Sequence, residues 1–242
     1  MSDKSHLDNL RVVLVETRNP LNIGAAARAM GNFGVSRLRL VRPYEPSFRG
    51  ARSAVGASDL LAKAEVFRSL ADAIGDCSLV VGTTAGARRQ LEHPLKPLPR
   101  AARLIRKRLD SGPVALLFGS EKKGLSNDHF SHCHWLMRIP TLEQRGSMNL
   151  GQAVAVCLYE LSRQAGAASA EQRQKASAGT VERFTELLLE NLRLSGYIKL
   201  RTAAVNELKI RRLVRRLDME ALDAQLLLGM LRQIGWKLRE KG

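Results

Sequence analysis

Short apolar segments alternate with helical patterns in this chain, and that alternation limits the folds it can adopt. Apolar or β-branched runs at Arg11–Glu16, Arg37–Val41 and Val114–Phe118 have the length of buried strands. Helical patterns lie between them, as over Asn22–Gly34 and Pro99–Leu109. Strands that alternate with helices favour a mainly parallel sheet with helices on both faces, so we predict an α/β fold. The further predicted elements are helices near Arg49–Leu61 and at Leu70–Ile74 and Ala153–Leu161, and strands at Ala64–Phe67, Leu79–Val81 and Trp135–Arg138.

The composition changes over Gln164–Gly179, a segment of small and polar residues that reads as a flexible linker. Apolar residues recur at helical spacing beyond it, over Val181–Leu194, Ala203–Leu217 and Glu220–Arg239. We therefore predict an α/β domain over residues 1–165, a linker over residues 166–179 and a small all-helical domain over residues 180–242.

Three glycine-bearing polar segments adjoin predicted strands. Asn22–Arg28 opens the helix after the first strand, Gly119–Gly124 follows Val114–Phe118, and Gly146–Gly151 follows Trp135–Arg138 and leads into an apolar helix. In parallel α/β sheets such loops meet at one edge and bind ligands there. The pattern predicts a small-molecule site at that edge.

Each segment also has a purely structural interpretation. The loop Gly119–Gly124 could be a turn before a helix capped by Ser126 or Asn127, and Ser147 or Asn149 could cap the helix that follows. Arg28, set among alanines on what would otherwise be a packing face, could be a solvated helix arginine. The glycine spacing matches neither a Walker loop nor the usual dinucleotide fingerprint.

The chain is strongly basic, with 39 Lys+Arg against 23 Asp+Glu and a formal net charge of +16. The basic residues concentrate in two runs, Arg88–Arg108 and Arg201–Arg216, one in each predicted domain. Such runs favour a polyanionic partner. Because only 5% of the residues are aromatic, phosphate and shape contacts with structured RNA are favoured over base stacking.

The sequence disfavours several other classes. It has no apolar run of about 18 residues and a polar start, so we expect neither a membrane span nor a signal peptide. Three widely spaced cysteines predict reduced structural thiols in a cytoplasmic protein: Cys77, Cys133 and Cys157. A cluster of three histidines and a cysteine matches no common zinc spacing, so we expect no metal: His129, His132, Cys133 and His134.

Taken together, the glycine segments resemble the motifs of the SPOUT superfamily of RNA methyltransferases, in its 2′-O-ribose-methylating branch. The segment Asn22–Arg28 resembles the first motif of the family, and Leu117–Leu125 resembles the second. The third motif is matched by Ile139–Pro140 followed by Ser147–Leu150. Within that branch the chain is most similar to the TrmJ type, which methylates cytidine or uridine in tRNA. The resemblance extends from Leu10 to about Arg239.

This resemblance implies a homodimer with a trefoil knot at the C-terminal end of the sheet. It implies S-adenosylmethionine as cofactor and the first nucleotide of the tRNA anticodon loop, position 32, as substrate. The cofactor-binding residues it implies are Thr83, Thr84, Ala85, Gly119, Gly124, Ile139, Gly146, Ser147 and Met148. The catalytic residues it implies are Arg28, Ser147, Asn149, Asn22 and Glu121.

Methyl transfer from a sulfonium is an in-line displacement, so the site must align the ribose oxygen with the methyl carbon. Family accounts make the counterpart of Arg28 the base, but a guanidinium with a pKa above about 12 suits a phosphate clamp better. We expect Arg28 to hold phosphate and stabilise the developing alkoxide. We expect Ser147 and Asn149 to orient the hydroxyl or the methionine moiety, and Glu121 to position its loop. The expected substrate-binding residues are Arg28, Arg88, Arg89 and Arg145.

Two alternatives stay open from the sequence. The same chemistry could act on ribosomal RNA or on another tRNA position. The chain could also be an RNA-binding module without catalysis, although the motif residues are intact.

Overall fold

The computed structural model describes residues 7–45, 58–85, 93–142, 147–163, 174–199 and 203–240. In these ranges seven strands form one parallel sheet, in the order β3-β2-β1-β6-β4-β7-β5. Their bounds are β1 Leu10–Val15, β2 Arg37–Val41, β3 Glu65–Phe67, β4 Leu79–Thr83, β5 Leu95–Pro97, β6 Val114–Phe118 and β7 Trp135–Arg138. The predicted α/β fold with a mainly parallel sheet is confirmed.

Helices cover both faces of this sheet. Their bounds are α1 Pro20–Asn32, α3 Ser58–Ala62, α4 Leu70–Ile74, α5 Leu98–Leu109, α6 Asn127–Ser131 and α7 Leu150–Ser162. Alternate side chains of β1 point to the two faces: Val12 joins the core under α1, α3, α5 and α7, and Val13 joins the core under α4 and α6. α1 and α7 approach closely, since a Cβ on Gly151 would lie 2.5 Å from the Cβ of Ala25.

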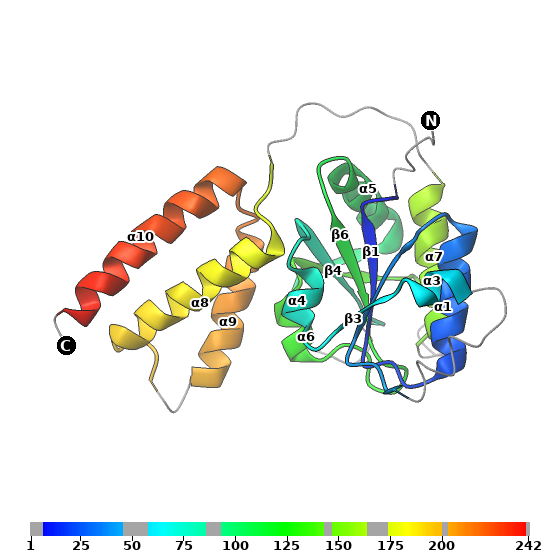
Figure 1. The fold of residues 1–242 in the computed structure, drawn as a ribbon, viewed down its shortest axis with the longest axis horizontal. Helices are drawn as coiled ribbons and strands as arrows, with labels where there is room; N and C mark the ends of the chain where they lie inside the picture. The colour runs from blue at the N-terminus through cyan, green and yellow to red at the C-terminus, as the bar shows by residue number, and fades with distance from the viewer. Residues whose placement is uncertain are drawn as a thin grey trace.

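Three longer helices follow: α8 Ala178–Leu194, α9 Ala203–Arg216 and α10 Ala221–Arg239. They share a separate small core that includes Phe184, Val214 and Leu228. Figure 1 shows them beside the sheet, with α10 outermost. The start of α8 contacts the loop after α4, where the Gly179 N–H donates to the Gly75 carbonyl at 2.8 Å.

The structure departs from the predicted elements in a few places. The edge strand β5 and the short helix α6 were not predicted as elements, although the predicted cap at Ser126 begins α6. β4 runs two residues further than predicted and ends at Thr83. Helix α8 begins at Ala178, inside the linker predicted over residues 166–179. Of the helix expected near Arg49–Leu61, residues 49–57 lie outside the described residues.

Among the described residues, no helix is long and apolar enough to cross a membrane. The three cysteines are free and buried, and burial raises the pKa of each thiol. Buried thiols of raised pKa are unreactive, as expected of structural cysteines.

Candidate active site at the carboxyl edge of the sheet

The predicted glycine segments meet at one edge of the sheet. β1, β6, β4 and β7 are consecutive neighbours and run in the same direction, so the loops that follow them emerge side by side. These loops begin at Glu16, Gly119, Thr84 and Ile139. The expectation that they converge is therefore confirmed for the described residues.

A chain of hydrogen bonds joins one residue from each of the three motifs. The Asn149 side-chain amide donates to Asn22 Oδ1 at 2.9 Å, and the Asn22 amide donates to Glu121 Oε1 at 3.0 Å. Glu121 also accepts from the backbone N–H groups of Asn19 at 3.1 Å and Arg18 at 3.2 Å. These contacts hold the first motif against the second, 99 residues away in sequence, and against the third, 127 residues away.

The carboxylate of Glu121 is held in its charged form. Burial by itself would raise its pKa, but hydrogen bonds from Asn22 and from backbone N–H groups outweigh burial, so the pKa lies below its ordinary value. Glu121 is therefore an anion in the structure, and its contacts hold the second motif against the first.

Glycines make the loop around Glu121 tight. Gly124 has φ +64°, and its N–H donates to the Ser120 carbonyl at 2.8 Å. A Cβ on Gly119 would lie 2.1 Å from the carbonyl carbon of Gly124, which excludes any other residue there. The loop turns back on itself and presents Glu121 to the first motif.

Asn149 has two functions at the start of α7. Its Oδ1 accepts from the Gly151 and Gln152 N–H groups at 3.0 and 3.3 Å, so it is the N-cap of the helix. Its amide nitrogen is then free to bond Asn22. Ser147 does not cap α7; it is exposed, beside a half-buried Met148.

The end of β4 is tied to its neighbours. The Thr83 hydroxyl donates to the Leu117 carbonyl at 2.8 Å, and the Thr84 N–H donates to the Met137 carbonyl at 3.0 Å. Thr83 thus uses its hydroxyl within the sheet, whereas Ala85 is exposed. Ile139 is half-buried and packs against the core under α7.

Arg28 lies on the exposed side of α1, so the interpretation that it occupies a packing face is wrong. The buried residues of the helix are on its other sides: Asn22, Ile23, Ala26, Ala27, Ala29 and Met30. No ion pair from another described residue engages Arg28. Its guanidinium is accessible, as a phosphate contact requires. The other expected substrate residues Arg88, Arg89 and Arg145, and the cofactor residue Gly146, lie outside the described residues.

Part of the second basic run is structural and not free for RNA. The Arg215 side chain is fully buried and donates to Glu182 Oε2 at 2.9 Å, and Arg211 donates to Glu182 Oε1 at 2.9 Å. In the first run, Arg108 pairs with Asp218 at 3.1 Å. A count of charges could not reveal this, because each carboxylate comes from a distant segment. Arg201, also in the second run, lies outside the described residues.

The histidine–cysteine cluster is part of the packing. His129 completes a capping box with Ser126, and His134 Nδ1 accepts from the Val80 N–H at 3.1 Å. His132 lies 3.7 Å from Glu182, and burial lowers its pKa to about 4. In the described part of the chain, no group of three or more potential ligands is arranged to hold a metal ion.

One feature of this edge was not predicted. Glu16 and Arg42, the residues that follow β1 and β2, both have left-handed backbones, with φ of 55° and 45°. They form an ion pair at 2.8 Å, and His129 Nε2 lies 3.5 Å from Arg42. Left-handed non-glycine residues carry strain and concentrate at functional sites. Spacing along the sequence gives no sign of such backbone strain.

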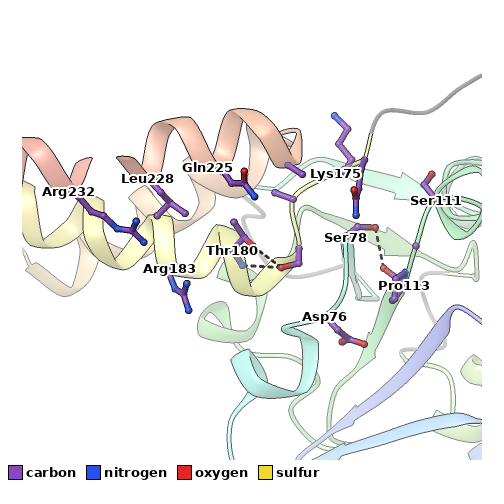
Figure 2. A pocket seen from close by; sticks show the side chains of 15 residues that line it. Asp76, Ser78, Ser111, Pro113, Lys175, Thr180, Arg183, Gln225, Leu228 and Arg232 are labelled. Atoms are coloured by element: carbon purple, nitrogen blue, oxygen red, sulfur yellow. Dashed lines mark hydrogen bonds between the residues drawn. The ribbon is translucent and has the colours of Figure 1, made fainter. Parts of the chain in front are cut away.

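A cavity of about 500 Å³ lies at the opposite edge of the sheet. Its walls include Ser78 and Pro113, before β4 and β6, together with Thr180 from α8 and Gln225 from α10, as Figure 2 shows. It contains none of the motif residues. The candidate active site is therefore the carboxyl edge.

Comparisons with known proteins identify the family of the chain. Residues 9–159 match the SpoU rRNA Methylase family. The tRNA (cytidine/uridine-2'-O-)-methyltransferase TrmJ of Yersinia pestis (strain Pestoides F) is 38% identical over 237 residues, covering 94% of this chain and 92% of its own. The protein of the same name from Sodalis glossinidius is 37% identical over 235 residues.

Solved structures give the same result. TrmJ from Z. mobilis ZM4 superposes with a TM-score of 0.82 at 30% identity, covering 93% of this chain and 98% of that one. A putative methylase family protein from Neisseria gonorrhoeae superposes with a TM-score of 0.66 at 29% identity, covering 75% of this chain and 95% of that one.

Proposed function

The chain belongs to the SpoU rRNA methylase family, and on this premise we propose that it methylates ribose 2′-hydroxyls of cytidine or uridine in tRNA. The observation that carries the proposal is the hydrogen-bond chain from Asn149 through Asn22 to Glu121. It assembles all three motifs at the ligand-binding edge of a parallel sheet. The resemblance read from the motifs is confirmed at the level of the family.

The residues at this edge fit S-adenosylmethionine, which supplies a methyl group on a sulfonium. Half-buried Ile139 and Met148 offer apolar surface for an adenine, and the exposed segments at Ala85 and Ser147 offer backbone and hydroxyl groups. Such a mixture is usual for nucleoside-type pockets. We propose that the loops at residues 83–85, 119–124 and 139–148 form the cofactor site.

The protein's residues act mainly by positioning. Arg28 holds the phosphate beside the target nucleotide and offsets the negative charge that develops on the ribose oxygen. Ser147 and Asn149 orient the 2′-hydroxyl, and Glu121 keeps the first and second motifs in register. Arg42 provides a second accessible cation at the same edge, held by Glu16.

Three finer features belong to the same proposal. The target is position 32 of the anticodon loop, the chain forms a homodimer, and its C-terminal part of the sheet is knotted. The packing of α7 against α1 and α5 supports the knot, because the chain crosses back from β7 to the first helix after the strands between them are in place. Helices α1 and α7 pack side by side, and each carries an exposed apolar side chain, Leu21 on α1 and Tyr159 on α7. These side chains support a dimer contact through α1 and α7.

The test uses the purified chain, S-adenosylmethionine and unmodified tRNA, with the methylated nucleoside identified by mass spectrometry and mapped by position. We expect 2′-O-methylcytidine or 2′-O-methyluridine at position 32, and no product when that nucleotide is 2′-deoxy. Product in ribosomal RNA or at another tRNA position would support the first alternative. If calorimetric titration of the chain with S-adenosylmethionine gave no heat of binding, the result would support the second alternative, an RNA-binding module without catalysis.

A further inference from the structure

One side of α10 carries a row of exposed apolar side chains. Four residues spaced by four positions are between 50% and 78% exposed: Leu222, Leu226, Met230 and Ile234. Four residues advance a helix by about one turn, so these side chains form one continuous stripe. We call these four residues the α10 stripe.

The stripe is not needed for packing within the chain. α10 already uses another side against α8, where Ala224, Leu228 and Gly235 are buried. Figure 1 shows α10 as the outermost helix, with α8 between it and the sheet. A stripe of large apolar side chains that faces solvent marks an interaction surface.

Three of the four stripe residues and two flanking charges are symmetric about Met230, which points to the partner. Leu226 and Ile234 lie four residues to either side of it, and Asp223 and Lys237 lie seven residues to either side. In an antiparallel pair of α10 helices with Met230 at the axis, Leu226 therefore faces Ile234 of the second copy. In the same arrangement Asp223, in the first turn, faces Lys237, in the last turn.

The middle of the stripe also allows close approach. Gly229 precedes Met230, is exposed, and has no atom within 4 Å of the position of a Cβ. Two helix backbones can come together where a side chain is missing. Lys237 pairs within the chain with Glu240, but its side chain is 60% exposed and such surface pairs are readily exchanged.

We propose that α10 pairs with α10 of a second copy of this chain, antiparallel and with two-fold symmetry. A two-fold contact uses the same surface twice, as the arrangement about Met230 requires. RNA is a poorer occupant, since the four stripe residues carry no charge. The contact is distinct from the α1 and α7 surfaces proposed for the dimer of the sheet. Figure 1 shows α10 at the opposite end of the molecule from these helices, so the contact joins copies that belong to different dimers. It does not depend on methyl transfer.

The test is disulfide trapping in the full chain. The native thiols are buried, so Met230→Cys supplies an accessible thiol beside its symmetry mate. Under mild oxidation we expect a covalent dimer on a non-reducing gel, formed at least about tenfold faster than with Arg232→Cys. Arg232 is the matched control, because it is exposed two residues further along the same helix and on another side.

Three additional variants separate this contact from chance collision. In the Met230→Cys chain, Leu226→Glu should abolish trapping. Asp223→Lys should slow it, and addition of Lys237→Asp should restore the rate by exchanging the charges. Equal rates for the cysteines at 230 and 232, or no restoration by the second charge change, would overturn the proposal. Circular dichroism of each variant checks that α10 remains folded.

Discussion

The side-chain amide of Asn149 donates to Asn22 Oδ1 at 2.9 Å, while the side-chain oxygen Oδ1 of Asn149 caps α7. One side chain thus begins a helix and connects the third motif to the first. A capping side chain satisfies backbone N–H groups in the first turn of its helix. Here the cap orients an amide toward the network that ends at Glu121, so helix formation and site assembly depend on the same residue.

Asn149→Asp separates these two functions. A carboxylate still accepts the capping bonds, but it has no amide to donate to Asn22. We expect kcat/KM for tRNA methylation to fall at least about tenfold, which is about 1.4 kcal/mol, with α7 intact by circular dichroism. Asn149→Ala should also lose the cap, at a cost of about 1 kcal/mol in the free energy of unfolding. Equal activity of Asn149→Asp and the parent would show that the bond to Asn22 is unimportant.

The lowered pKa of Glu121 predicts a pH dependence of stability. Because its folded-state pKa lies below the unfolded value, its contribution is present above the unfolded pKa of about 4.3 and is lost as the pH falls through the folded pKa. Glu121→Gln should therefore be less stable than the parent at pH 7, and the difference should shrink toward pH 3. Urea unfolding across this range measures it.

The comparison with Glu190→Gln controls for loss of a carboxylate alone. Glu190 pairs at 2.9 Å with Arg239 on the surface, and its removal should change the unfolding free energy by less than about 1 kcal/mol. A constant difference between the parent and Glu121→Gln from pH 7 to pH 3 would contradict the assignment of a charged Glu121.

Much of this architecture could be predicted because local patterns determine it. The run Val114–Phe118 is apolar throughout and became a strand buried on both faces, and Ser126 and Asn149 cap helices as their positions suggested. β5 could not be predicted, because its three residues Leu95–Pro97 have no periodicity and pair only at the sheet edge.

The site was predicted as a set of residues but not as a network. The alternation of strands and helices predicts that the loops with Asn22, Glu121 and Asn149 lie at one edge of the sheet. It does not predict which of these side chains bond to one another, because that depends on the geometry of the loops. The left-handed backbones at Glu16 and Arg42 and the burial of Arg215 depend on tertiary contacts with distant residues. Charge counting treats Arg215 like any surface arginine, so it overestimated the basic surface of α9.

Arg28→Lys tests how the exposed guanidinium acts. Lysine keeps the charge but cannot hold a phosphate with two parallel hydrogen bonds. We expect kcat/KM to fall at least about tenfold, with the free energy of unfolding changed by no more than about 0.5 kcal/mol because the side chain is exposed. Arg37→Lys, at an exposed position before the buried part of β2, is the matched control and should retain full activity. Nearly full turnover by Arg28→Lys would exclude bidentate gripping.

Glu182→Ala tests the buried cluster that joins α8 to α9. The substitution leaves the fully buried Arg215 without its carboxylate, and breaking a buried pair on one side costs about 3–5 kcal/mol. Glu207→Ala removes the partner of Arg193 at the surface and should cost less than about 1 kcal/mol. Urea unfolding followed by circular dichroism compares the two. If both variants lost the same small amount of stability, Arg215 would have another source of compensation, and the helical extension would be held mainly by its apolar core. A large loss confined to Glu182→Ala would instead show that a residue from the basic run is committed to the fold and is unavailable to RNA.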